Sequence, residues 1–329
     1  MRRQILALGT LAFVMALIMA VGATAQAEME QYESEVILSL PWGSGPNEIG
    51  YAKEGPEDAE GLRYGPTAID VDQDGNIYIY DMVNSRVKVF DQKGNLLKNF
   101  GVRATSSNIC VDTQKAVWVV DTMKPELHKY APDGTLVETI QYEPLRREGI
   151  SFLPSKIECR GGKIYLNEFE LQLRKVEGKD RKGENIRKAT LTQIGGHRWG
   201  ITRSGRHYRV ESTSDLIKTF VVTDENDRIL GNISIEQRHP YDDIAFLSED
   251  RTGNMYLLFA THTNDRDFYE EIRKYDRSYN LIAKIGPLLR TFYTARCRIE
   301  KGLVLDEEGS VYQLITEKEG VKIVKWSRK

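Results

Sequence analysis

The sequence predicts an all-β protein built from repeated units of four short antiparallel strands. Segments of alternating apolar and polar residues, rich in β-branched and aromatic side chains, follow one another along most of the chain, as is typical of half-buried strands. Turns such as Asp74-Gly75 and Asp133-Gly134 separate these segments and supply the positive φ that tight hairpins need. The same order of strands and turns recurs after forty residues, which is typical of the blades of a β-propeller.

The N-terminus has the features of a secretory signal peptide. Arg2 and Arg3 precede an apolar run from Ile5 to Val21, and small residues up to Ala27 fit a cleavage site. We therefore expect residues 1–27 to be a signal peptide, residues 28–329 to form a single propeller domain, and the protein to be periplasmic or secreted. An uncleaved N-terminal anchor is the alternative, because about 20 apolar residues span a bilayer. No further membrane span is expected.

The repeats can be followed along the whole mature chain. Residues 66–94 form the first repeat, and the second reproduces its strands forty residues later, at 109–134. More divergent copies follow at 155–194 (with a long polar insertion), 207–233, 244–285 and 302–326. The last copy has three strands only, whereas the strand-like segment 34–40 precedes the first repeat. We expect this N-terminal strand to close the last blade, giving a six-bladed β-propeller.

The first repeat carries a recognisable motif. It reads Asp72-x-x-Gly75-x-Ile-Tyr-x-x-Asp81, followed by Asn84-x-Arg86, and it resembles the NHL repeat. The second repeat keeps most of the motif but has Glu126 at the position of Arg86. The resemblance implies that Asp81, Arg86 and Asp121 are structural and tie blades to their neighbours. Proteins with such repeats include extracellular sensors, RNA-binding domains of ubiquitin ligases and a zinc-dependent lyase, so the fold does not select a function.

Three cysteines are too few for a fold that depends on disulfides. Cys110 and Cys159 fall in the first strands of neighbouring repeats, so a bridge between them is one alternative; Cys297 is the third cysteine. Because the two side chains are predicted to lie on opposite strand faces, we expect buried free thiols instead.

One mouth of the central channel is the expected binding site, since propeller loops carry side chains on a rigid scaffold. Aromatic rings next to arginines suit sugars, peptides or anionic small molecules; the alternative is that these side chains only plug the channel. We expect ten residues on loops that precede the inner strands to gather there: Arg63, Tyr64, Phe152, His197, Arg198, Trp199, His239, Tyr241, Arg290 and Tyr293.

Metal sites are not expected. Asp70, Asp72 and Asp74 imitate the start of an EF-hand loop, but strands flank them instead of helices. The resemblance to the zinc-dependent lyase implies three histidines that converge on a zinc ion at the axis. His197 and His239 fall on axial loops, the places of His207 and His262 are ambiguous, and His128 falls on an outer strand. No cofactor is expected either.

Charge gives one further alternative. Residues 174–209 contain eleven Lys or Arg against three Asp or Glu, so this insertion is either a solvated surface or a contact for a polyanion such as lipopolysaccharide. The whole chain is balanced, with 46 basic and 48 acidic residues. Together with export, this balance argues against nucleic acid as a partner.

The function expected from these features is a monomeric, non-catalytic binding or protein-interaction module whose partner is a small ligand, a glycan or a protein. The alternative is a propeller enzyme such as a lyase, a lactone hydrolase or a glycan-active protein. The sequence contains no Gly-x-Ser-x-Gly nucleophile elbow, so no catalytic residue can be named and the question of catalysis stays open.

Overall fold

The computed structural model describes residues 29–53, 63–104, 107–147, 150–154, 156–167, 169–179, 185–193, 200–202, 204–214, 216–224, 226–236, 243–264, 267–288 and 301–329. The predicted signal peptide lies outside these residues. Every regular element in the described ranges is a β-strand. Across these same ranges, the structure contains no helix with the length and apolar character needed to cross a membrane.

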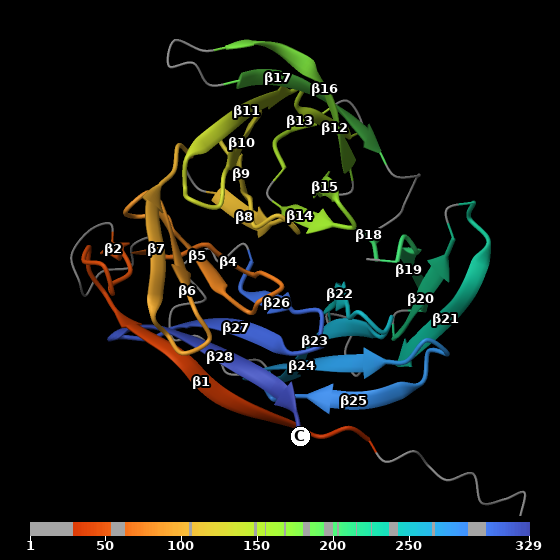
Figure 1. Cartoon of the computed structure of the whole chain (residues 1–329). Coiled ribbons are helices and arrows are strands. Elements are labelled where there is room, and N and C mark those ends of the chain that lie inside the picture. The colour runs from red at the N-terminus through yellow and green to blue at the C-terminus, as the bar shows by residue number, and fades with distance from the viewer. Residues whose placement is uncertain are drawn as a thin grey trace, which may run out of the picture.

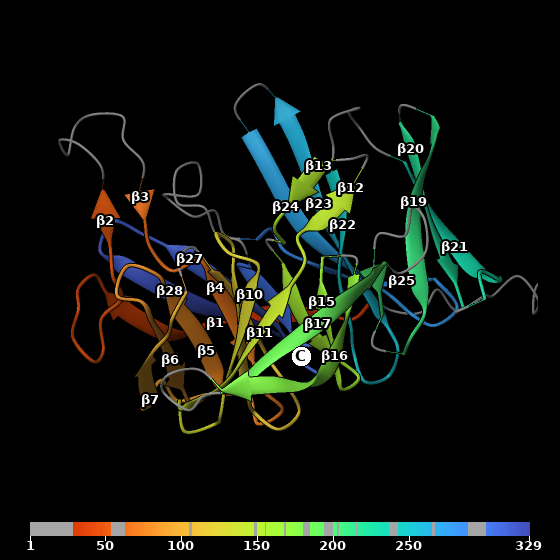
Figure 2. The ribbon, with the colours of Figure 1, turned by 90° about the horizontal axis from the view of Figure 1, so that it is seen from above.

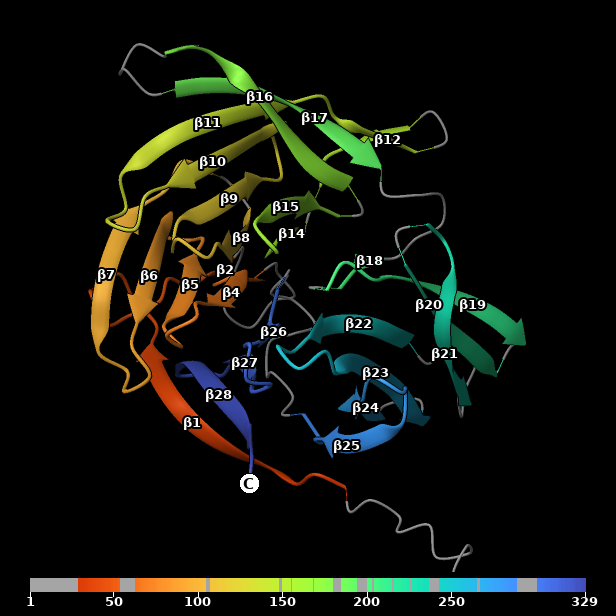
Figure 3. The ribbon, with the colours of Figure 1, turned by 45° about the vertical axis from the view of Figure 1, so that its right-hand side comes forward.

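The sheets stand around a central axis, so the chain folds as an all-β propeller (Figures 1 and 3). In each repeat, the first strand in sequence lies innermost and the following strands pair outward in antiparallel order. The first repeat shows this arrangement with β4 (Ala68–Val71), β5 (Ile77–Asp81), β6 (Arg86–Phe90) and β7 (Leu96–Gly101).

The N-terminal strand closes the ring. Strand β1 (Tyr32–Pro41) pairs antiparallel with β28 (Gly320–Arg328), placing Val36 opposite Val324. The sheet continues inward through β27 (Val311–Thr316) to β26 (Leu303–Leu305). The predicted closing strand is therefore confirmed, and the pairing covers an edge that would otherwise be open to association.

The strands predicted for the second and third blades form one sheet of eight. Its halves meet where β11 and β17 pair in parallel, because the long β16–β17 hairpin places β17 along the outer edge of β11. The described part of the ring therefore contains five large sheets, and the prediction of six separate blades is not confirmed. The eight strands are β8 (Ser107–Val111), β9 (Val117–Asp121), β10 (Glu126–Tyr130), β11 (Leu136–Tyr142), β14 (Ile157–Arg160), β15 (Lys163–Leu166), β16 (Phe169–Lys179) and β17 (Asn185–Gln193).

Two more four-stranded sheets and two short hairpins complete the described fold. The fourth repeat comprises β18 (Gly200–Ile201), β19 (His207–Ser214), β20 (Ile217–Thr223) and β21 (Ile229–Glu236). The fifth comprises β22 (Asp243–Glu249), β23 (Met255–Asn264), β24 (Asp267–Tyr275) and β25 (Leu281–Ile285). The hairpins β2–β3 (Ala52–Lys53, Arg63–Tyr64) and β12–β13 (Leu145–Arg147, Ile150–Phe152) rise on the same side of the ring (Figure 2).

Among the described residues the core lies between neighbouring sheets, as both faces of the first repeat show. In β5, Ile77 and Ile79 pack towards the last sheet, whereas Tyr78 and Tyr80 pack towards the second repeat. This alternation follows from the two-residue period of a strand and explains why the inner strands carry apolar residues at nearly every position.

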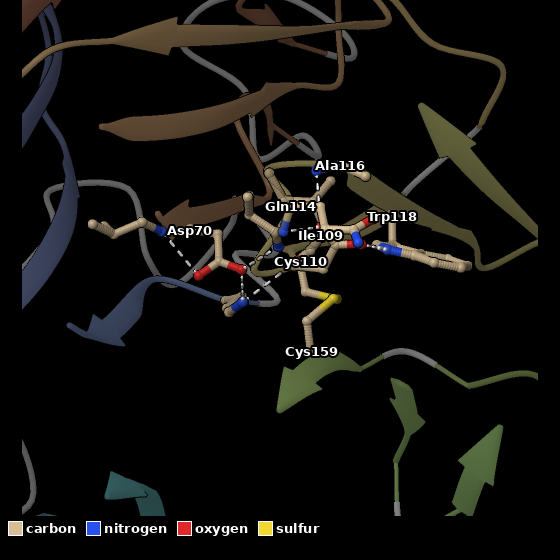
Figure 4. Close-up of a disulfide and its surroundings, with 11 residues drawn as sticks. Asp70, Ile109, Cys110, Gln114, Ala116, Trp118 and Cys159 are labelled. Carbon is tan, nitrogen blue, oxygen red and sulfur yellow. Dashed lines mark hydrogen bonds and ion pairs between the residues drawn. A yellow bond between two sulfur atoms is a disulfide. The ribbon is translucent and has the colours of Figure 1, made fainter. Parts of the chain in front are cut away.

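The cysteine prediction was wrong: Cys110 and Cys159 form a disulfide (Figure 4). The two side chains do lie on opposite faces of their own repeats, since Cys110 faces the third repeat and Cys159 packs back against the second. Blades of a propeller stack front to back, however, so these opposite faces are the ones that meet. The bridge joins inner strands β8 and β14, whose cysteines are 49 residues apart in sequence.

Candidate functional site

An Asp begins most of the inner turns and organises each of them. In the second repeat, Asp112 accepts the backbone N–H groups of Gln114 and Ala116, both at 2.9 Å, with one carboxylate oxygen. Its other oxygen accepts the indole N–H of Trp118 at 2.8 Å. Asp favours such turns because its short side chain bonds backbone N–H groups two to four residues ahead. An aromatic side chain donates to the turn carboxylate in the same way in three other repeats, in the pairs Tyr78–Asp72, Tyr256–Asp250 and Tyr312–Asp306.

The third repeat departs from this pattern. Only Gly161 and Gly162 lie between the paired residues Arg160 and Lys163, and both glycines have positive φ, at 54° and 75°. This turn is shorter than the turn at residues 112–116 of the second repeat. A Cβ atom added to Gly162 would meet nothing within 4 Å. The short turn therefore leaves open space at the channel mouth where the inner strands end.

A pocket of about 600 Å³ occupies this space between the second and third repeats. On one wall, Trp118, Lys129 and Glu138 form a row across adjacent strands, since Lys129 pairs with Trp118 on one side and with Glu138 on the other. The facing wall belongs to the third repeat and contributes apolar side chains from β15 and β16, namely Ile164, Leu171 and Leu173. Leu173 is 41% exposed, so the wall offers apolar surface to a ligand.

Both ends of the interface that holds this pocket are tied. At the inner end, the Cys110–Cys159 disulfide joins the two inner strands, and Cys159 lines the pocket. Figure 4 shows Trp118, which belongs to the second repeat, beside this bridge. At the outer end, β11 pairs with β17 from Glu138–Asn185 to Tyr142–Ala189. The walls are therefore held at a fixed separation before any ligand binds.

The charged groups of the pocket differ in how far they are paired. The Arg187 guanidinium donates to Glu138 at 2.6 Å. The carboxylates of Asp72, Asp112 and Asp306 are engaged by turn amides and aromatic donors. Lys129 differs from all of them, because its Nζ atom lies 4.8 Å from the centre of the Trp118 ring and, among the described residues, forms no ion pair. Positive charge is thus the least satisfied feature of the pocket.

Further charges lie along the inner strands beside the pocket. Lys301 and Asp70 approach to 2.9 Å, while Asp70 accepts the backbone N–H of Val111 and Lys301 donates to the carbonyl oxygen of Ile109. These contacts join the last sheet to the first and second repeats. Because each group is met by a partner of opposite charge or by backbone, the network holds the inner strands together.

Glu158 carries the largest resolved carboxyl shift near the pocket. Burial alone would raise its pKa, but Arg160 and Lys156, each 2.7 Å away, outweigh burial and lower the pKa to about 2. Arg160 also stacks over the Phe246 ring at 5.5 Å. Glu158 is therefore ionised at neutral pH and holds Arg160 at the edge of the pocket.

Three of the ten predicted ligand residues are described, and they lie away from this pocket. Arg63 and Tyr64 form β3, ahead of inner strand β4, and Phe152 ends β13 on the same side of the ring (Figure 2). The pocket, in contrast, lies where inner strands β4, β8, β14 and β26 end. Seven of the predicted residues fall outside the described part of the chain: His197, Arg198, Trp199, His239, Tyr241, Arg290 and Tyr293. Their role stays a prediction.

Sequence reasoning missed Trp118 and Lys129, although two signals were present. The spacing from Asp to aromatic residue recurs between repeats, and Gly161-Gly162 replaces the longer turn in the third. A comparison of the inner turns would have indicated that the third repeat leaves space for a pocket.

Two of the three predicted structural residues, Asp81 and Arg86, contact the loop that follows β1. Arg86 donates to the buried Asp81 carboxylate at 2.8 Å and to the carbonyl oxygens of Ser44 and Gly45. Asp81 also accepts the backbone N–H of Gly50. Among the described residues, Asp121, its counterpart in the second repeat, accepts the backbone N–H groups of Met123 and Lys124 alone. The first pair can therefore tie the closing sheet to the first repeat, and Asp121 can hold only its own turn.

The metal-binding alternatives have distinct surroundings. Asp70 bonds Lys301, Asp72 bonds its own turn, and Asp74 bonds Lys115, so these three carboxylates do not converge. Burial lowers the pKa of His128, whose ring contacts Thr139 on β11. Within the described residues, no group of three or more His, Cys, Asp or Glu side chains could share a metal ion.

Solved structures resemble this chain in fold. A member of the DUF4221 family from Bacteroides vulgatus aligns with a TM-score of 0.51 and 11% identity, over 92% of this chain and 100% of the other. The chain is a β-propeller. A gluconolactonase from Xanthomonas campestris (TM-score 0.45, 12% identity, 93% of each chain) is also similar. So is a virginiamycin B lyase from Staphylococcus aureus (TM-score 0.43, 11% identity, 86% of this chain and 100% of the other).

At these identities the likeness concerns the fold alone, and it selects neither an enzyme nor a binding protein. No protein-family model and no curated protein matches the chain. Membership of the NHL-repeat family is not confirmed.

Proposed function

We propose that this protein is an exported, non-catalytic binding propeller that holds a ligand, or a segment of a partner protein, in the pocket between the second and third repeats. The observation that carries the proposal is a pocket of about 600 Å³ whose interface is tied by a disulfide at one end and by strand pairing at the other. A preformed site loses less freedom on binding, because its walls are already ordered.

The chemistry of the lining supports binding over reaction. Glu138 is bonded to Arg187, and Asp112 is bonded to Trp118, so these groups hold the walls in place. The groups left to meet a ligand include the apolar surface of Leu173 and the ammonium of Lys129. This combination suits a molecule with an apolar part and a polar part.

Two finer points belong to the same proposal. We interpret the eight-stranded sheet as two blades fused along β11 and β17, which gives a six-bladed ring of NHL-like repeats. A disulfide between Cys110 and Cys159 supports an oxidising compartment, because cytosolic thiols are kept reduced. The signal-like segment at residues 1–27 agrees with export.

Methyl NMR of the isotope-labelled protein tests the proposal. The probes are acetyl-Leu-Glu-Leu-amide, maltotriose and gluconolactone, which represent peptides, glycans and lactones. At least one probe should shift the methyl signals of Ile164, Leu171 and Leu173, and the probe should remain chemically unchanged. Leu97, which is 49% exposed on β7, reports on non-specific contact with the surface.

A pair of variants localises the response. Leu173→Trp fills the pocket and should abolish the shifts, whereas Leu97→Trp should preserve them. The proposal fails if none of the probes shifts the pocket methyl groups, or if a probe is consumed, which would favour the enzyme alternative.

A further inference from the structure

We propose that Lys129 anchors a carboxylate of an acidic peptide segment supplied by a partner protein. This proposal rests on the proposed function, because it names the ligand class for the same pocket. It goes beyond that function in assigning Lys129 as the residue that selects the ligand.

The fifth repeat contains an occupied version of the same arrangement. Lys274 lies 5.5 Å from the centre of the Tyr256 ring, and its ammonium lies 2.7 Å from the carboxylate of Glu30. Glu30 belongs to the N-terminal segment, which runs along β25 through a parallel bridge with Ala283. A peptide segment of this chain thus fills the site with an acidic side chain.

The second repeat has the same framework. Asp112 bonds Trp118 as Asp250 bonds Tyr256. Lys129 is the cross-strand neighbour of Trp118, just as Lys274 is the cross-strand neighbour of Tyr256. Both lysines therefore project from the same face of equivalent strands, towards the following repeat.

The two sites differ in whether a carboxylate is available to the lysine. The cross-strand neighbour of Lys274 on the outer side is Ala283, and Glu30 supplies the charge from the added segment. The corresponding neighbour of Lys129 is Glu138, but Arg187 of the added strand β17 bonds this carboxylate at 2.6 Å. Lys129 is left without a carboxylate among the described residues. An unpaired ammonium in a partly enclosed site gains from a carboxylate ligand, because ionised hydrogen bonds are the stronger ones.

The pocket also fits the rest of a peptide. Lys129 lines a space of about 600 Å³, which is larger than one carboxylate requires and lies within the range of sites that hold drug-sized ligands. Leu171 and Leu173 offer apolar contacts opposite Lys129. Since β17 already covers the edge of β11, a peptide cannot be added there as a strand, so it would bind through its side chains in the pocket. An acidic residue flanked by apolar residues meets these requirements.

The test compares acetyl-Leu-Glu-Leu-amide with its Gln analogue and with acetyl-glutamate. For wild type, the Glu peptide should bind at least about tenfold more tightly than the Gln peptide, as one charge-assisted contact predicts. Acetyl-glutamate should bind more weakly than the Glu peptide, because it lacks the apolar contacts. If acetyl-glutamate binds as tightly as the peptide, the site serves a small carboxylate and the peptide proposal is overturned.

Variants of matched lysines identify the anchor. Lys129→Met should remove the preference for Glu over Gln, and Lys129→Arg should retain it. Lys325 is the control, since it lies 5.3 Å from the centre of its cross-strand neighbour Tyr312 but does not line the pocket; Lys325→Met should bind like wild type. Equal binding of both peptides to wild type, or a preference that survives Lys129→Met, overturns this proposal while the pocket function stands. The proposed function itself fails only if acetyl-Leu-Glu-Leu-amide, maltotriose and gluconolactone all leave the pocket methyl signals unchanged.

Discussion

The Arg160 guanidinium lies 2.7 Å from the Glu158 carboxylate two residues earlier on inner strand β14. Both side chains extend from the face of the strand opposite to Cys159, which bonds Cys110 across the pocket interface. One short strand therefore carries a covalent tie on one face and an ion pair on the other, beside the glycine turn that opens the pocket.

Replacing Glu158 with Gln should make stability less sensitive to acid. A carboxyl group whose pKa falls from 4.5 to about 2 on folding stabilises the fold above pH 4.5, and this contribution is lost as the pH falls towards 2. Wild type should therefore lose more free energy of unfolding than Glu158→Gln between about pH 5 and pH 2, as urea titrations would measure. Parallel losses in both proteins would contradict the assigned pairing.

Removing the disulfide should lower the stability of the whole ring. Closing a loop with a separation of 49 residues stabilises by about 4 kcal/mol through the entropy of the unfolded chain. Cys110→Ser, Cys159→Ser and the double variant should lose similar amounts, because each removes the same bond. A double variant twice as destabilised as either single variant would show that the cysteines act independently.

Breaking the Asp81–Arg86 pair should cost on the order of 3 kcal/mol, because Asp81→Ala leaves a partly buried guanidinium without its carboxylate. Asp121→Ala should cost about 1 kcal/mol, since it removes only hydrogen bonds to backbone. Thermal and chemical unfolding measure both losses. The Asp81→Ala loss should be the same with and without calcium, and a loss confined to calcium-containing buffer would revive the EF-hand interpretation.

Lys88 should make the protein more stable at alkaline pH. Its side chain is fully buried and donates to the carbonyl oxygens of Gly45 and Pro46. Burial, followed by the nearby Arg86, lowers its pKa from 10.5 to about 8. The unfolded chain then binds more protons between these two values, so stability rises with pH across this window. From pH 8 to pH 10.5, the unfolding free energy of wild type should therefore rise relative to that of Lys88→Met. Lys93→Met, at an exposed turn position, is the control and should show no such change relative to wild type.

Local structure was readable from the sequence because it depends on local chemistry. The turns at Asp72 and Asp112 and the alternation around Ile77 set the inner hairpins. The missing strand of the last repeat indicated that β1 would close it. Each of these follows from strand periodicity and turn chemistry, which neighbouring residues carry.

Apart from the glycine turn and the recurring spacing from Asp to aromatic residue, the candidate site was not readable because it depends on contacts between repeats. The pairing of β11 with β17 joins two outer strands that periodicity treats alike. The partnership of Cys110 and Cys159 depends on which faces of successive blades meet. Among the described residues, Lys129 has no carboxylate partner because Arg187, from another repeat, bonds Glu138. None of these relations has a signature in one segment.

The most direct test of the account is a crystal structure of the protein grown with acetyl-Leu-Glu-Leu-amide. The account predicts the peptide between Trp118 and Leu173, with its carboxylate within hydrogen-bond distance of Lys129 and with the Cys110–Cys159 bridge and the β11–β17 pairing unchanged. A peptide bound at another surface, or a pocket whose walls have closed on each other, would contradict it.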